Sequence, residues 1–417
     1  MSTVRKRRRP AAGCPGGSQP SVAIVADRSN GYARGFIEGV VDFAESHREW
    51  RFELLDPVAF ASAKVDDFDG FVCRLPDRNS GRRLERLGRP VVEALGKDEF
   101  KGFVSVLSDV DAASRIVADH FFSRFHVNFA YCGFDGQRYS ARRAETFARC
   151  LAERGKSLFV YEAPVAARRQ FRQRIQFDAP LDMPDARELE GWLRKLPKPV
   201  ALFCCNDRRA FQALALCRKA GLRVPQDVAI CGVDNDTLLC DFSNPRLTSV
   251  DPDARKVGYT AVRTLADMIV GSGPAVARAG DSIVVPPRGL VARASTALFL
   301  VEPDWMGEAL VFIRQHVGDR LTASDVLAFL GRSRNAVGEQ FRKTLGHSVQ
   351  AEIASVRLEM AKRLLADGAL SVNDVARLSG YATPEYFWRC FSESCGVSPT
   401  QYRSRALNGI SGKIKRT

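Results

Sequence analysis

The C-terminal part of the chain repeats itself at an interval of about 50 residues, and this repeat strongly limits the possible folds. One copy contains Gly331 and Phe341, and the other contains Gly380 and Phe391. Each copy is typical of two helices separated by a tight turn, because glycine permits the positive φ of such a turn. The sequence therefore predicts an all-α domain with two helix-turn-helix units over residues 303–407, followed by a tail at 408–417.

The segment between the two copies has helical spacing. Ile353, Val356, Met360 and Leu364 mark one apolar face over residues 351–366. A helix there would join the two units rigidly. A plain helical bundle is the alternative interpretation, but the paired spacing of the two copies is more specific than a bundle requires.

Exposed polar residues on the second helix of each unit are candidates for contacts with DNA, because that helix enters the major groove. Arginine suits guanine, whereas asparagine and glutamine suit adenine. Each candidate could instead be ordinary solvated surface. The candidates are Arg334, Asn335, Glu339 and Gln340 with Arg342 nearer the backbone in the first copy, and Thr383, Glu385, Tyr386 and Arg389 in the second.

The preceding part of the chain alternates short apolar runs with helical patterns. Residues 22–26 and 228–232 are typical of buried strands, and residues 111–122 and 208–220 of helices. This alternation predicts parallel sheets with helices on both faces. Because the units are too many for one sheet of common size, we expect a two-lobed α/β domain over residues 21–298. Residues 1–20 are basic at the start and are interpreted as a flexible tail.

The charge balance favours a polyanionic partner. Lys and Arg number 62 against 48 Asp and Glu, which gives a net charge of +14. An arginine-rich proteome is the alternative explanation. No apolar run approaches the roughly 18–20 residues that span a bilayer, and no secretory signal follows the basic start. We therefore expect a cytoplasmic protein without membrane contact.

Motifs for catalysis and metal binding are missing from the sequence. The eleven cysteines form no C-x-x-C pair, and the five histidines form no H-E-x-x-H cluster, so we expect no metal and no cofactor. There is also no G-x-S-x-G and no Walker A loop, which argues against an enzyme. A transport binding protein would need export and would leave the last hundred residues unexplained.

The C-terminal motifs resemble the AraC/XylR class of transcription regulators. The match comprises R-L-x-x-A-x-x-L-L at 357–365, V-A-x-x-S-G-Y at 375–381, Y-F-W-R-C-F at 386–391 and G-V-S-P-T-Q-Y-R at 396–403. It covers essentially all of residues 310–405. The resemblance implies sequence-specific binding to double-stranded operator DNA.

The N-terminal domain resembles the periplasmic sugar-binding-protein fold of LacI-class repressors. Supporting motifs include C-N-D-R-R-A at 205–210 and V-P-Q-D-V-A-I-C-G-V-D-N-D at 224–236. The resemblance implies a sugar site between the lobes, at the carboxyl ends of strands. The effector-binding residues that it implies are Arg28, Arg143, Asn206, Asp207 and Asp234. For Asp207 a helix-capping role is the alternative, and for Arg143 or Asp234 an interlobe salt bridge.

The order of the two domains resembles regulators of xylose operons. This resemblance implies D-xylose or a close pentose as effector, activation of transcription, a homodimer and contact with RNA polymerase. Another sugar, a purine or a repressor of the same architecture remain alternatives. We expect the lobes to be joined by crossovers near Val104, Asp234 and Val250, and lobe closure to change how the helical domain is presented to DNA.

Overall fold

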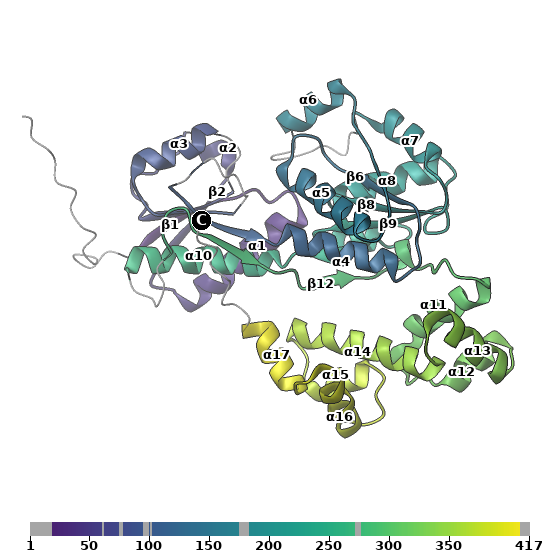
Figure 1. The fold of residues 1–417 in the computed structure, drawn as a ribbon. Coiled ribbons are helices and arrows are strands. Elements are labelled where there is room, and N and C mark those ends of the chain that lie inside the picture. The colour runs from purple at the N-terminus through teal and green to yellow at the C-terminus, as the bar shows by residue number, and fades with distance from the viewer. Residues whose placement is uncertain are drawn as a thin grey trace, which may run out of the picture.

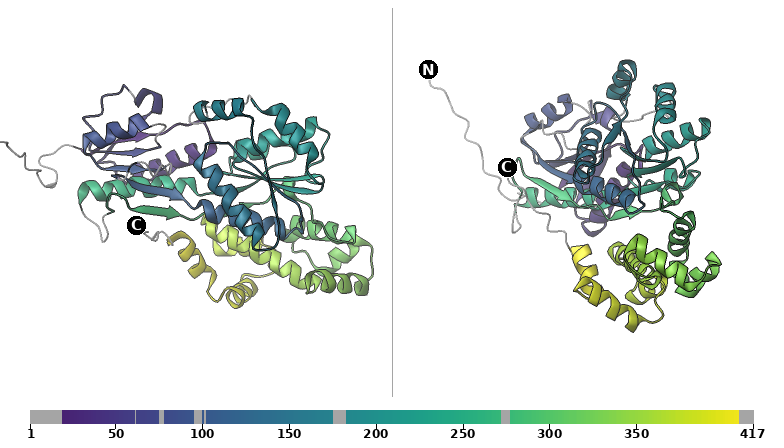
Figure 2. Two further views of the ribbon diagram at one scale, coloured as in Figure 1. Left: turned by 45° about the horizontal axis from the view of Figure 1, so that its top comes forward. Right: turned by 45° about the vertical axis from the view of Figure 1, so that its right-hand side comes forward.

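The computed structural model describes residues 19–60, 62–74, 78–94, 100, 102–174, 183–271 and 277–408. Two α/β lobes lie side by side, and an all-helical domain lies along one side of them (Figure 1; Figure 2). The predicted fold class is confirmed. The tails predicted at 1–20 and 408–417 lie almost entirely outside the described residues.

Lobe 1 is built on a six-stranded parallel sheet in the order β11-β5-β4-β3-β1-β2. The strand β1 is buried on both faces, since Val22 and Ile24 pack into one apolar cluster while Ala23 and Val25 pack into another. This two-sided burial explains why the strand is a continuous apolar run. The strands are β1 (Ser21–Val25), β2 (Arg51–Leu55), β3 (Gly70–Cys73), β4 (Val91–Glu93), β5 (Val104–Ser108) and β11 (Ser282–Val285). The helices are α1 (Gly31–Ser46), α2 (Pro57–Phe60), α3 (Arg78–Leu87) and α10 (Ala254–Val270).

Lobe 2 is built on a second six-stranded sheet in the order β12-β10-β9-β8-β6-β7, in which only β12 is antiparallel. Its core is rich in aromatic side chains and buried thiols. The strands are β6 (Phe129–Cys132), β7 (Leu158–Val160), β8 (Val200–Cys204), β9 (Val228–Val233), β10 (Thr248–Asp251) and β12 (Gly289–Val291). The helices are α4 (Val110–Phe122), α5 (Arg138–Ala152), α6 (Val165–Arg174), α7 (Ala186–Lys195), α8 (Asp207–Lys219), α9 (Thr237–Phe242) and the 3₁₀ turn η1 (Ala294–Thr296).

The chain crosses between the lobes at three places, which form the hinge. It crosses between β5 and α4, between β10 and α10, and between β11 and β12. The crossovers expected near Val104 and Val250 are therefore present. The crossover expected near Asp234 is wrong, because the chain passes from β9 through α9 to β10 within lobe 2. The third crossover instead covers residues 286–288.

The C-terminal domain consists of two helix-turn-helix units joined by one long helix. Gly331 and Gly380 have φ of 60° and 77°, as the predicted tight turns require. Separate apolar clusters form around Phe341 in the first unit and Phe391 in the second. The helices are α11 (Asp304–His316), the 3₁₀ turn η2 (Val317–Asp319), α12 (Ala323–Leu330), α13 (Arg334–Leu345), α14 (Val349–Asp367), α15 (Val372–Leu378), α16 (Pro384–Cys395) and α17 (Pro399–Asn408). None of the helices described in the chain is both long and apolar enough to cross a membrane.

Candidate functional site

Asp234 lies at the junction of the two lobes, directly after β9. Its φ is 117°, which residues other than glycine rarely adopt, so the surrounding structure must hold it in place. Burial is the largest influence on its carboxyl group and raises its pKa to about 7, while the cation of Arg143 acts in the opposite direction. A carboxyl group in such surroundings is a candidate for ligand binding.

Arg143 approaches Asp234 from α5 of the same lobe. Its side chain is almost completely buried, donates a hydrogen bond to the carbonyl oxygen of Cys205 and lies 5.2 Å from the ring centroid of Tyr139. The Nε atom of Arg143 is also buried and has no hydrogen-bond partner among the described residues. A buried donor without a partner is costly, so this N–H group is suited to a polar ligand.

Lobe 1 contributes Arg74 and Tyr32, which were not predicted from the sequence. The guanidinium of Arg74 lies 5.1 Å from the ring centroid of Tyr32 and 3.2 Å from the carboxylate of Asp27. Tyr32 Oη shares a hydrogen bond of 2.9 Å with Ser108 Oγ. Both residues interact electrostatically with Asp234 across the junction of the lobes. The sequence did contain a signal for Arg74, because this residue directly follows the apolar run of a strand and ligands bind at the carboxyl ends of such strands.

Asn206 and Asp207 have different structural roles at the start of α8. Asn206 caps the helix, since its side-chain oxygen accepts a hydrogen bond of 3.0 Å from the backbone N–H of Arg209. Asp207 is buried and accepts hydrogen bonds from Ser249 Oγ at 2.5 Å and from the backbone N–H of Asp236 at 2.8 Å. The helix-capping role considered for Asp207 thus belongs to Asn206, and the contribution of either residue to ligand binding stays a prediction.

Asp236 links the lobes directly. Its carboxylate accepts hydrogen bonds from the backbone N–H of Gly31, at 2.9 Å, and from the guanidinium of Arg34, at 2.8 Å. Gly31 begins α1, so the positive end of that helix favours the contact. Arg28, by contrast, is exposed and makes no hydrogen bond with the described part of the chain. Its contact with the effector stays a prediction.

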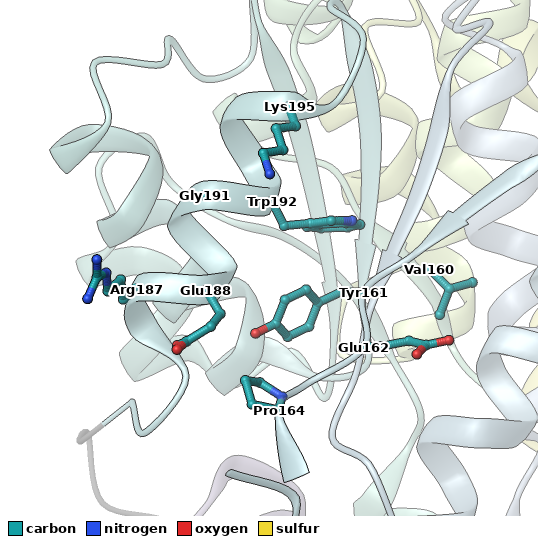
Figure 3. Close-up of a pocket in the computed structure, with 9 residues that line it drawn as sticks. All are labelled: Val160, Tyr161, Glu162, Pro164, Arg187, Glu188, Gly191, Trp192 and Lys195. Carbon is teal, nitrogen blue, oxygen red and sulfur yellow. The ribbon is translucent and has the colours of Figure 1, made fainter. Parts of the chain in front are cut away.

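A hollow of about 690 Å³ lies elsewhere on lobe 2, between β7 and α7 (Figure 3). Tyr161 and Trp192 line it with ring centroids 5.2 Å apart. Behind Tyr161 the guanidinium of Arg209 is completely buried and forms an ion pair with Asp185. None of the predicted effector residues lines this hollow, so it is separate from the interlobe site.

The helices α13 and α16, here called the reading helices, present polar side chains to solvent. Phe341 and Phe391 anchor them in the two apolar clusters, and Ser333 and Thr383 cap their first turns. The exposed candidates are Arg334, Asn335, Glu339 and Arg342 on α13, and Glu385, Tyr386 and Arg389 on α16, with Thr383 just before it. Their exposure is compatible with the predicted contacts to DNA.

Two details of the reading helices were not predicted. The amide of Gln340 donates hydrogen bonds to the carbonyl oxygen of Glu302 and to Thr344, so it faces the chain that leads into the domain. Trp388 lies on the exposed side of α16 and was not among the candidates. An offset of 50 residues aligns it with Gly338, and this offset is visible in the sequence.

The hinge is tied to the helical domain by an arginine. Arg288 lies in the crossover between β11 and β12, and its Nε is 3.3 Å from the carboxylate of Asp253, in the crossover between β10 and α10. Its Nη1 is 3.4 Å from the carboxylate of Asp367, the last residue of α14. One side chain therefore joins two hinge crossovers to the helix that carries both units.

The end of α4 forms a second contact between lobe 2 and the helical domain. Phe125 packs against the apolar core of the first unit. The guanidinium of Arg124 donates to the carbonyl oxygen of Thr296 and lies 5.1 Å from the ring centroid of Phe299. Arg314 of α11 lies 4.4 Å from the same ring. Because α4 starts at a hinge crossover, this contact also connects the hinge with a helix-turn-helix unit.

Comparison with known proteins gives two domain matches. Residues 118–296 match the periplasmic binding protein-like domain, and residues 326–405 match a helix-turn-helix domain. The matched residues include Arg143, Asn206 and Asp234 in the first domain and both reading helices in the second.

Several relatives align with the chain over nearly their whole length. The chain is 25% identical to the xylose operon regulatory protein of Escherichia coli K12 over 92% of the chain and 96% of the relative. It is 21% identical to the protein of that name in Haemophilus influenzae, over 92% and 97%. A solved structure of the xylose-binding transcription activator xylR has a TM-score of 0.56 at 23% identity and covers 92% of this chain and 97% of the other. These relatives are regulators rather than enzymes. The chain is thus a homologue of the xylose operon regulatory proteins, with a periplasmic binding protein-like domain followed by a helix-turn-helix domain.

Proposed function

We propose that the protein is a sugar-responsive transcription regulator that binds D-xylose or a close pentose between its lobes and operator DNA through α13 and α16. One observation carries the proposal: Asp234 and Arg143 of lobe 2 lie within electrostatic range of Arg74 and Tyr32 of lobe 1, in a chain that also presents two reading helices. Similarity over nearly the whole length to xylose operon regulatory proteins supports the choice of sugar. By the same analogy, the regulator activates its operon.

The four interlobe side chains suit a neutral polyol. A sugar hydroxyl both donates and accepts hydrogen bonds, so the carboxylate of Asp234 can accept from it while Arg143 and Arg74 donate. The ring of Tyr32 offers a flat apolar surface for sugar C–H groups. Since the groups come from both lobes, a ligand that bridges them favours the closed arrangement. The proposed role is binding without catalysis.

The geometry of the helical domain supports a paired mode of DNA binding. The single helix α14 holds the two units together (Figure 1). Two rigidly joined reading helices would address major-groove segments about one turn, roughly 10 bp, apart. The effector domain is proposed to cover residues 21–298 and the DNA-binding domain 303–407. A homodimer paired through the lobes, contact with RNA polymerase and a cytoplasmic location complete the proposal.

Titration calorimetry of the full chain tests the effector. The sugars to compare are D-xylose, D-ribose, L-arabinose, D-glucose and D-galactose, and D-xylose is expected to bind most tightly. Tighter binding of a hexose would replace the proposed sugar but keep the class of effector. Absence of binding by all five would contradict a sugar site at the lobe junction.

A further inference from the structure

The two reading helices differ most in side-chain size at the position in the middle of their exposed faces. An offset of 50 residues aligns α13 with α16, because the buried Val337 and Phe341 then match the buried Phe387 and Phe391. The exposed faces of both helices follow the spacing i, i+1, i+4, i+5 and i+8. The aligned pairs are Arg334 with Pro384, Asn335 with Glu385, Gly338 with Trp388, Glu339 with Arg389 and Arg342 with Ser392.

The i+4 position carries glycine in α13 and tryptophan in α16. The side chain of Trp388 is 39% exposed, although neighbouring Phe387 and Phe391 are completely buried. Within the described part of the chain it makes no hydrogen bond and no ring contact. On the exposed face of a reading helix, this large indole is available for contact with DNA.

The neighbours of Trp388 restrict what the indole can meet in a major groove. Glu385 and Arg389 flank it on the same face, and a carboxylate there disfavours phosphate and suits the amino group of cytosine. The indole itself presents mainly C–H groups. Among base edges in the major groove, the apolar group is the C5 methyl of thymine.

We infer that Trp388 contacts a thymine methyl group, so that the half-site under α16 differs chemically from the half-site under α13. In α13 the corresponding Gly338 leaves that position without a side chain, and Arg334 and Asn335 favour guanine and adenine. The operator is therefore asymmetric within one protomer's footprint, and Trp388 fixes which way round the two units bind. This inference rests on the proposed function, namely DNA binding through α13 and α16.

Replacement of single thymines by deoxyuridine tests this contact, since it removes only the methyl group. An operator is first selected from random duplex DNA with the full chain, and each thymine is then replaced in turn at fixed salt. With the wild-type protein, we expect a loss of about four-fold in affinity at one or two thymines of the α16 half-site, the value of one buried methyl group. With Trp388→Ala, the same replacements should have no effect, and Trp388→Phe should keep part of the difference.

Two variants control for indirect effects. Arg389→Ala should weaken binding but still distinguish thymine from deoxyuridine. Phe329→Ala, which removes an exposed aromatic ring from α12 of the first unit, should also still distinguish the two bases. Thermal unfolding must show that Trp388→Ala is folded, and Trp388→Phe provides the test if it is not. An equal loss on deoxyuridine for wild type and Trp388→Ala, or no loss at any thymine, overturns the inference while leaving DNA binding intact. Failure to select any sequence contradicts the proposed function itself.

Discussion

Asp234 combines a strained backbone, burial and two neighbouring cations, and it is the residue on which we expect sugar affinity to depend most. Replacement by Ala removes the acceptor for sugar hydroxyls and leaves the O–H donors of the sugar without a partner. A hydrogen bond to a charged group is worth about 1.5–3 kcal/mol, so Asp234→Ala should lower sugar affinity by about 10- to 150-fold in calorimetry. Asp119→Ala, on the exposed surface of α4, is the control and should bind normally.

If Asp234→Ala bound sugar with wild-type affinity, Asp234 would not belong to the sugar site. The stability of this variant should be measured in parallel, because Ala tolerates a positive φ less well than Asp, and this is a separate effect of the substitution.

The raised pKa of Asp234 also predicts a pH dependence. Since its pKa in the folded protein is about 7, the carboxyl group gains a proton as the pH falls through neutrality. The ionised form accepts hydrogen bonds from hydroxyls better, so sugar affinity should rise from pH 6 to pH 8, with release of a proton on binding near pH 7. Asp234→Asn should abolish this pH dependence. Equal affinity of the wild type at the two pH values would contradict the prediction.

The effect on stability has the opposite sign. The pKa of Asp234 in the folded state lies above the value of about 3.9 in an unfolded chain. Between these two values the folded state binds more protons, so the contribution of this group to stability decreases as the pH rises from about 4 to about 7. Chemical unfolding of the wild type and Asp234→Asn across this range measures the difference.

The residues of lobe 2 were easier to predict than those of lobe 1. Arg143 and Asp234 lie in motifs that carry the family resemblance, and the structure brings them together. Arg74 belongs to no such motif, and its approach to Asp234 depends on how the lobes fold against each other. Asp207 was grouped with the ligand residues, but its hydrogen-bond partner Ser249 is 42 positions away, too far for local sequence patterns to show.

Among the helices and strands, the reading helices α13 and α16 give the most direct predictions for DNA binding. Arg334 and Arg389 are exposed on α13 and α16. If each reads a base, Arg334→Ala and Arg389→Ala should each cost about 1–3 kcal/mol on the operator and relax specificity at one position. Arg154→Ala, which removes the same charge from the exposed surface of lobe 2, should leave operator affinity unchanged. Binding competitions at constant salt measure all three.

An equal loss of affinity on operator and random DNA would instead assign Arg334 or Arg389 to the phosphate backbone. In that case the dependence of affinity on salt should become weaker by about one released counterion for each variant.

The type of each element was largely predictable, but its connections were less so. The turns at Gly331 and Gly380 and the joining helix α14 agree with the sequence patterns, since periodicity and turn chemistry are local. The hinge was only partly predicted, because the strand β9 and the crossovers have the same local pattern of an apolar run followed by a turn. Which sheet the next element enters depends on long-range pairing, as the register of Ser282 beside Ser105 shows.

At the scale of the whole molecule, sugar binding at the lobe junction must change the arrangement of the DNA-binding domain in order to change DNA affinity. A ligand changes DNA affinity only if it binds one lobe arrangement better than another. Arg288 connects two crossovers of the hinge to Asp367 at the end of α14, where an unpaired carboxylate would be unfavourable at the negative end of the helix. Lobe closure that moves the crossovers therefore changes this contact. The contact between Arg124 and Phe299 provides the second connection between lobe 2 and the helical domain.

Coupling between the two ligands should be reciprocal, so operator DNA should tighten sugar binding by the factor by which sugar tightens operator binding. The contacts of Arg288 are partly exposed, and such ion pairs contribute about 0–1 kcal/mol. We therefore expect that loss of the contact with Asp367 in Arg288→Gln lowers the coupling factor by up to about five-fold, and that the contact of Arg124 with Phe299 carries the remainder. The control is Arg255→Gln, which breaks an exposed ion pair with Asp42 inside lobe 1 and should leave the coupling unchanged. Sugar titrations of each protein with and without an operator fragment give the factor directly. If Arg288→Gln retained the full wild-type factor, the hinge contact would have no part in the switch, and identical sugar affinities of the wild type in the two titrations would mean that the domains are only tethered.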